Sequence, residues 1–258
     1  MERLFDRRMG QPSGLTANGI RMWGMFLLAA SVVGGSIIQH KVFGINSSTN
    51  GSLTDLVGSN MLLATIAIIL QACGACAVCV YTFLMVEGVL NTSDMKAYVQ
   101  RVAGVAILSE IPYNLAFSGK WFDLSTRNPA FGILIGLVVL WFYKLFPGFN
   151  AKNVLYKIIA TIGAYLWCAM LGISDGICVV IIGLILWAFQ KKHQMRVYAG
   201  AMAAIVCSII SPFYMIAPVV FLLLHSYNGE KGESNTVLNY VSYPVMLIVV
   251  VLIGKFAF

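Results

Sequence analysis

The chain has 258 residues, of which 59% are hydrophobic and 10% charged, and its formal net charge is +7. A soluble domain carries about 25% charged residues, so this composition excludes a soluble globular protein and indicates a membrane protein. The basic residues lie in short gaps between apolar segments and never form a block of five like charges, which excludes a nucleic-acid-binding arm. Because the apolar segments recur from end to end, we expect residues 1–258 to form a single membrane-embedded domain.

Nine segments are predicted as transmembrane helices, since about 20 apolar residues cross the hydrocarbon core of a bilayer. The expected fold is therefore an all-α, polytopic helical bundle. The eighth segment is short, and the second and third could bend at Gly74 and Pro112. The nine segments are 20–38, 61–86, 102–118, 130–146, 154–171, 174–189, 197–213, 214–226 and 237–257.

The positions of Lys and Arg predict the orientation of the bundle, because these residues are enriched in cytoplasmic loops. With the N-terminus inside, thirteen of the seventeen fall on the cytoplasmic side and four on the outer side. This asymmetry favours nine spans with the C-terminus outside, residues 39–58 outside and the loop 190–196 inside. We therefore expect a multi-pass protein of the cytoplasmic (inner) membrane, with the lipid bilayer as its immediate partner.

All six cysteines lie inside apolar segments, and three of them recur at every third position as Cys73, Cys76 and Cys79. In a soluble loop this spacing would suggest a metal site. Here no histidine is nearby, and small residues three apart on one helix face allow helices to approach closely in lipid. We therefore predict close helix packing, with no metal site and no disulfide framework.

Three ionisable residues, Glu87, Arg101 and Glu110, lie within or at the ends of the second and third segments. Such residues are costly in lipid and usually face a cavity or a partner. Glu110 is expected near the middle of the membrane beside the helix-breaking Pro112, where it could bind a cation, shuttle a proton or pair with Arg101. Alternatively, Arg101 pairs with Glu87 or Glu110 and only fixes the packing of the helices.

The three histidines, His40, His193 and His225, all lie near the ends of predicted spans. A position at the membrane interface favours an interfacial role over a catalytic one for each of them.

The polar residues of the second and third segments form a recognisable block. It begins at Val86-Glu87-Gly88, continues through Thr92, Tyr98 and Arg101, and ends at Ser109-Glu110-Ile111-Pro112-Tyr113-Asn114-Leu115-Ala116-Phe117. This block resembles the TraX family. The resemblance extends along the chain in four further motifs: Gly14-Leu15-Thr16-Ala17-Asn18, Asn128-Pro129-Ala130-Phe131, Tyr227-Asn228-Gly229-Glu230-Lys231-Gly232 and Tyr243-Pro244.

The TraX family is named for a bacterial conjugation protein associated with N-terminal acetylation of pilin, and it is grouped with multi-spanning membrane acyltransferases that take the acyl group from the cytoplasmic face. The resemblance therefore implies a membrane acyltransferase, with acetyl-CoA as the acyl donor if the protein is active. It also implies a cavity lined by Glu87, Arg101, Tyr113, Asn114, Asn128, Asp175 and Asn228.

The chain departs from the family at the residues that could move protons. The family's Asp-His-Ile-Gly is replaced by Ser31-Val32-Val33-Gly34, and its Tyr-Pro-Leu-His-Leu by Tyr243-Pro244-Val245-Met246-Leu247. Both intramembrane histidines are therefore absent. Proton transfer needs a titratable group within reach of the reacting atom, which leaves Glu110 or His40 as the expected catalytic residue. Asp175 is a weaker choice, because we expect it in a short outer turn open to solvent.

Three functions remain open from the sequence. The altered site favours a non-catalytic relative, a binding or accessory subunit whose cavity holds a partner protein, a peptide or a lipid. The alternatives are an active acyltransferase that modifies an extracytoplasmic or membrane-presented amine or hydroxyl, and a transporter, which the proline-broken third segment permits.

Overall fold

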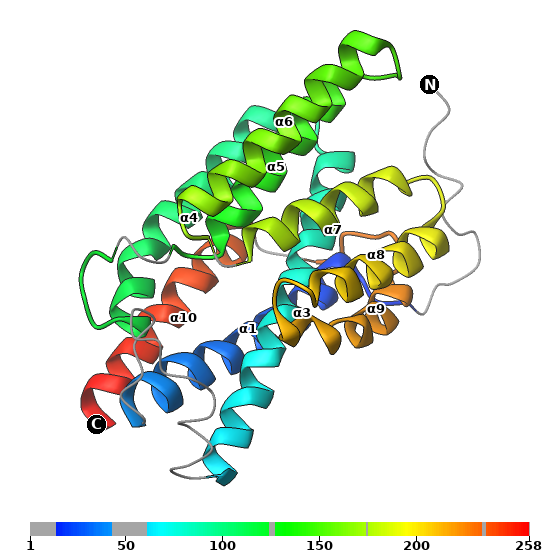
Figure 1. Ribbon diagram of the computed structural model, residues 1–258. Coiled ribbons are helices and arrows are strands. Elements are labelled where there is room, and N and C mark those ends of the chain that lie inside the picture. Colours follow the sequence, from blue (N-terminus) through cyan, green and yellow to red (C-terminus); the bar gives the residue numbers. More distant parts are fainter. Residues whose placement is uncertain (1–13, 43–60, 124–126, 174, 234–235, 258) are drawn as a thin grey trace.

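The computed structural model describes residues 14–42, 61–123, 127–173, 175–233 and 236–257, although not the side chains of 39–42, 236–238 and 256–257. All regular structure in these ranges is helical (Figure 1). The helices are α1 (Ala17–Val32), η1 (Val33–Val42), α3 (Met61–Asn91), α4 (Met95–Phe117), α5 (Ala130–Leu145), α6 (Ala151–Met170), α7 (Gly176–Ala188), α8 (His193–Cys207), η2 (Pro212–Met215), α9 (Pro218–His225) and α10 (Thr236–Ala257).

The all-α prediction is confirmed in the described part of the chain, where each predicted segment contains one α-helix. Within the described ranges, three helical stretches are long and apolar enough to cross a membrane: Ala17–Ile38, Met61–Asn91 and Ala151–Met170. By contrast, α9 has eight residues and rises roughly 12 Å, less than the hydrocarbon core. Nine crossings and their orientation therefore stay predictions, and most of the outer segment 39–58 lies outside the described residues.

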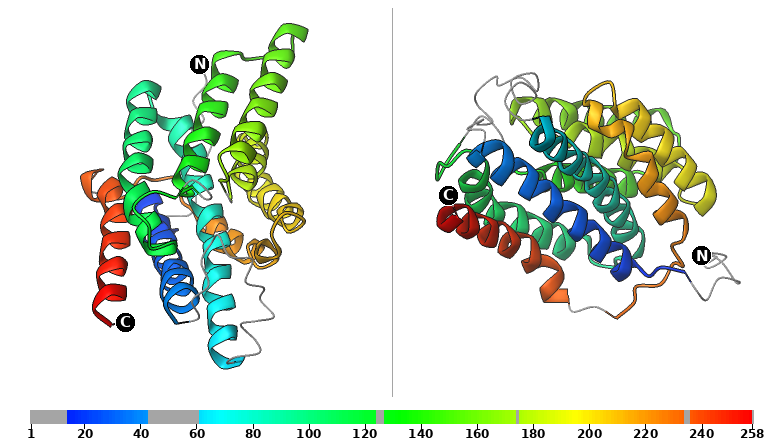
Figure 2. Two further views of the ribbon diagram at one scale, coloured as in Figure 1. Left: turned by 60° about the vertical axis from the view of Figure 1, so that its left-hand side comes forward. Right: turned by 90° about the horizontal axis from the view of Figure 1, so that it is seen from below.

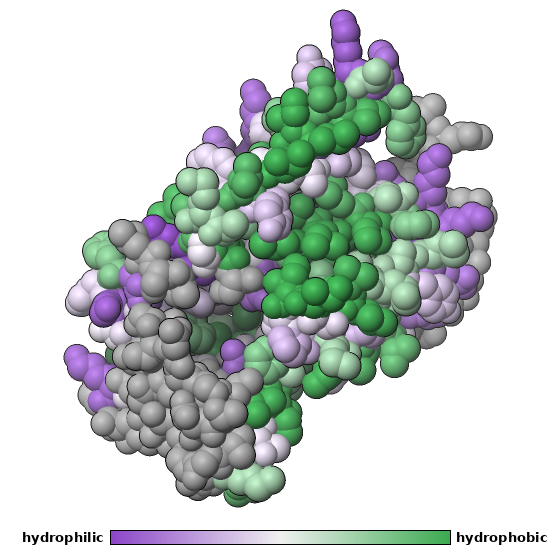
Figure 3. All heavy atoms as spheres, viewed as in Figure 1, coloured by the Kyte–Doolittle hydropathy of each residue, from purple (hydrophilic) through white to green (hydrophobic). Residues whose placement is uncertain are grey.

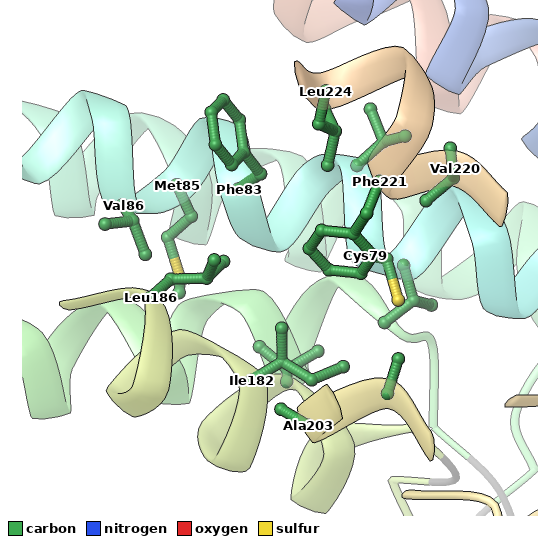
Figure 4. Close-up of a cluster of buried hydrophobic side chains, with 14 of the residues drawn as sticks. Cys79, Phe83, Met85, Val86, Ile182, Leu186, Ala203, Val220, Phe221 and Leu224 are labelled. Carbon is green, nitrogen blue, oxygen red and sulfur yellow. The ribbon is translucent and has the colours of Figure 1, made fainter. Parts of the chain in front are cut away.

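Helix α3 lies at the centre of the bundle and contacts α1, α5, α7 and α9. The main apolar core forms where α3, α7, α8 and α9 meet (Figure 4). Phe83 of α3, Leu186 of α7 and Phe221 of α9 point into this core and are almost completely buried. Cys79 lies in the same core as a buried free thiol, where a small side chain lets neighbouring helices approach. Viewed from below, α1 lies between α3 and α10 (Figure 2).

The outer surface is rich in large apolar side chains. Ile209, Leu222 and Phe26 are 87%, 74% and 67% exposed. Figure 3 shows hydrophobic side chains over a broad band of the visible face, with hydrophilic side chains gathered towards its ends. A continuous apolar surface of this extent would be unstable in water and is suited to contact with lipid chains.

Candidate functional site

A cavity of about 620 Å³ with charged, aromatic and apolar lining residues opens between α1, α3, α4 and α10. Its charged lining residues are Arg21, Glu87, Arg101 and Lys231, from α1, α3, α4 and the loop after α9. Five tyrosines also line it: Tyr81, Tyr98, Tyr227, Tyr240 and Tyr243. The structure thus brings Glu87 and Arg101 to the same cavity wall, together with cationic and aromatic residues that are distant in the sequence.

One wall of the cavity is built by two of the sequence motifs, which meet although they lie near opposite ends of the chain. The first turn of α1 donates backbone hydrogen bonds to the loop after α9, from Ala17 N to Glu230 O at 2.8 Å and from Asn18 N to Lys231 O at 3.1 Å. These bonds satisfy N–H groups that a helix start leaves unpaired. Gly229 and Gly232 adopt φ angles of 84° and 71°, which only glycine adopts readily.

Asn228 belongs to this loop and does not line the cavity. Its side-chain Oδ1 accepts a hydrogen bond from Glu230 N at 2.9 Å, and its Nδ2 donates one to the Glu230 carboxylate at 3.2 Å. Asn228 therefore shapes the loop that carries Tyr227 and Lys231.

Glu87 is the acceptor of a buried polar cluster near the C-terminal end of α3. Its Oε1 forms an ion pair with Arg196 of α8, and its Oε2 accepts hydrogen bonds from Asn91 Nδ2 at 3.0 Å and Tyr227 Oη at 3.3 Å. The Arg196 guanidinium also lies 4.4 Å from the centre of the Phe83 ring. The predicted Glu87–Arg101 pair is wrong: the cation that neutralises Glu87 is Arg196, which the sequence assigned to a cytoplasmic loop.

Glu110 lies in a second buried cluster, two turns before α4 ends at Phe117. Its Oε1 pairs with Arg127 Nη1 at 3.0 Å, and its Oε2 accepts a hydrogen bond from the backbone N–H of Asn128 at 3.2 Å. Tyr243 of α10 donates to Asn128 Oδ1 at 2.8 Å. The predicted Glu110–Arg101 pair is therefore also wrong. Glu110 and Asn128 join α4, α5 and α10 behind the cavity and do not line it.

We expected Asp175 to face open solvent, and this prediction is wrong. Asp175 lies in the turn before α7 and is half-buried, and its Oδ1 accepts a hydrogen bond from Tyr214 Oη of η2 at 2.9 Å. This contact fastens the turn between α8 and α9 to the start of α7, away from the cavity.

The two positions at which the family resemblance predicts histidines belong to one apolar cluster. Val32, the last residue of α1, and Met246 of α10 pack in one small apolar cluster with Tyr113 and Phe117 of α4. Asn114, the residue after Tyr113 on α4, is 1% exposed, and neither atom of its side-chain amide has a hydrogen-bond partner among the residues that the structure describes. The backbone of His40 belongs to η1, but its side chain lies outside the described residues.

Several residues of these clusters were not recognised from the sequence as site residues. Arg21, Arg127, Arg196 and Lys231 were counted only as loop charges that set topology. In the sequence, the loop after α9 was indicated by the motif from Tyr227 to Gly232, which resembles a motif of the family. A hydrogen-bond partner on another helix depends on how the helices pack, which a single sequence does not reveal.

The long apolar helices and the exposed apolar surface, which is suited to contact with lipid chains, identify the class as a membrane protein. Residues 53–254 match the family model described as TraX protein, and this match covers most of the chain. The chain therefore belongs to the TraX family. Neither a curated protein nor a solved structure matches it.

Proposed function

We propose that this chain is a TraX-family membrane protein that holds a ligand in its cavity as a binding or accessory subunit and does not transfer acyl groups. The packing of Val32 and Met246 in one apolar cluster is the observation that carries the proposal. Valine and methionine side chains cannot move protons, so the place where the family has two histidines offers no general base. The proposal includes a bacterial cytoplasmic membrane and a membrane protein or peptide as partner.

The engagement of Glu110 supports the same function. Both of its carboxylate oxygens are occupied, one by Arg127 and one by the backbone of Asn128. A base must approach the reacting group within hydrogen-bond distance, and Glu110 does not line the cavity in which a ligand would bind. Its role is to fix the packing of α4 against α5.

An active acyltransferase is the second candidate, and one feature of the cavity favours it. Tyr227 and Glu87 both line the cavity, and Tyr227 Oη donates a hydrogen bond to the Glu87 carboxylate at 3.3 Å. Acetyl-CoA, the donor that the family resemblance implies, carries phosphates whose charge suits Arg21, Arg101 and Lys231. Bound acetyl-CoA would supply the thioester, while Glu87 would hold the Tyr227 hydroxyl in place.

A transfer assay separates the two functions. Membranes that contain the chain are incubated with radiolabelled acetyl-CoA, and label is measured in the lipid, protein and peptide fractions. A TraX-family relative that retains both histidines is the positive control. We expect no more transfer than in membranes without the chain.

Chain-dependent transfer would overturn the non-catalytic role. The variants Glu110→Gln, His40→Ala and Tyr227→Phe would then identify the residue on which transfer depends. Loss of transfer in Tyr227→Phe alone would establish the cavity pair as the active group.

A further inference from the structure

The cavity carries more positive charge than its own carboxylate balances. Arg21, Arg101 and Lys231 line it, and in the described part of the chain none of the three forms an ion pair with a carboxylate. Glu87, the one acidic lining residue, is neutralised by Arg196 from outside the lining. Among the described residues no carboxylate pairs with these three cations, so the cavity offers a site for an anionic ligand.

Arg21 is the cation whose environment most clearly requires a partner. Its Nη1 is buried and has no hydrogen-bond partner among the described residues. A buried donor without an acceptor is energetically unfavourable, whereas an oxygen of a bound anion would satisfy it. Arg21 and Arg101 both lie close enough to Tyr98 to interact with its hydroxyl electrostatically. Tyr98 also lines the cavity, so the two guanidinium groups lie near the same part of the lining.

Much of the remaining lining is apolar, although tyrosine, amide and hydroxyl side chains also contribute to it. Val78 and Met85 of α3, Val102 and Val105 of α4, and Ile133 of α5 form part of the wall. The cavity thus joins a cationic region to an apolar one within a volume of about 620 Å³, a size typical of small-molecule sites. A ligand complementary to both regions has an anionic group and a hydrocarbon portion.

We propose that the cavity binds an amphiphile whose polar end carries a phosphate. The phosphate would lie among Arg21, Arg101 and Lys231, with its hydrocarbon portion against the apolar wall. Guanidinium groups match phosphate oxygens in geometry and charge, and three cations suit a phosphate better than the single charge of a fatty-acid carboxylate. The proposal rests on the ligand-binding role proposed above and names the class of ligand.

Binding of two probes tests the proposal and separates two sources of the same chemistry. The full chain, purified in neutral detergent, is titrated with dioleoyl phosphatidic acid, followed by native mass spectrometry, and with radiolabelled palmitoyl-CoA. Dioleoylglycerol, which has the same acyl chains without the phosphate, is the matched control ligand. We expect saturable binding of at least one phosphate-bearing probe and none of dioleoylglycerol.

Three variants test the residues: Arg21→Gln, Arg101→Gln and Lys231→Gln. Arg101 and Lys231 are exposed at the cavity mouth, so their variants are expected to fold. Each loss of a charged partner should weaken binding by about tenfold or more. Lys152→Gln removes an equal charge from an exposed position on α6, away from the cavity, and should bind like the unaltered chain.

Failure of both phosphate probes to bind, equal binding of dioleoylglycerol, or unchanged binding in Arg101→Gln and Lys231→Gln would overturn the proposal. Acyl transfer would overturn the non-catalytic role and leave the ligand class standing. Absence of both transfer and binding would reject the ligand class alone, so the two failures are distinguishable.

Discussion

At the scale of single residues, the buried pair between Glu87 and Arg196 is the contact whose loss should cost most. Both side chains are almost completely buried, at 5% and 2% exposure. Removing one partner leaves an uncompensated buried charge and should lower the free energy of unfolding by about 3–5 kcal/mol. We predict this loss for Glu87→Gln and for Arg196→Met, measured by unfolding in mild detergent.

The double variant Glu87→Gln/Arg196→Met is the internal control for this prediction. The double variant removes both charges, so its free energy of unfolding should fall by less than the sum of the decreases in the two single variants. Glu110→Gln offers a second comparison, because its partner Arg127 is 26% exposed and water can solvate the cation that remains. Equal losses in Glu110→Gln and Glu87→Gln would contradict the importance given to burial.

The residue-level site could be predicted only in part from the sequence. Glu87 and Glu110 stood out because an ionisable side chain in an apolar segment needs a partner. Their partners could not be identified, because Arg196 and Arg127 look like ordinary loop cations in the sequence. Arg196 is buried because α8 packs against the core. This burial depends on tertiary packing, which no local sequence pattern encodes.

At the scale of helices, the crossing of α5 and α7 depends on two glycines in contact. A Cβ at Gly132 would lie 2.8 Å from the backbone Cα of Gly176, and a backbone atom cannot move aside cheaply. We predict that Gly132→Ala lowers the free energy of unfolding by about 1–3 kcal/mol, the usual cost of overpacking. Thermal unfolding followed by circular dichroism would measure it.

Gly104→Ala on α4 is the matched control, because nothing lies within 4 Å of its added Cβ. In a helix interior this replacement should stabilise by about 0.5–1 kcal/mol. A loss in Gly104→Ala as large as in Gly132→Ala would mean that the contact between α5 and α7 is not the cause.

The helices themselves were largely predictable from apolar segment length, which gave one segment for each α-helix of the described chain. Their ends were less so: α3 continues to Asn91, one turn beyond the predicted end at residue 86. The polar residues Glu87 and Asn91 are retained in the helix because Arg196 and Tyr227 bind the Glu87 carboxylate, which in turn accepts a hydrogen bond from Asn91. The short η2 before α9 was not predicted at all.

At the scale of the whole molecule, the orientation predicted from charge remains to be measured. Lys120 lies in the exposed loop before α5, and Lys191 in the exposed turn before α8. Cysteines introduced at these two positions should react with a membrane-impermeant thiol reagent from opposite sides, Lys120→Cys from outside and Lys191→Cys from the cytoplasm. Five of the six native cysteines are buried, which keeps background labelling low.

Reaction of both positions from the same side would refute the predicted topology.

The hydrogen bonds between the start of α1 and the loop after α9 have a consequence for how the protein is made. The N–H groups of Ala17 and Asn18 leave the ribosome long before their acceptors, which belong to Glu230 and Lys231. Until those residues have been synthesised, this helix end can be satisfied only by water at the membrane surface. The lining of the ligand cavity is therefore complete only after the loop that carries Lys231 and the part of α10 that carries Tyr243 have been synthesised.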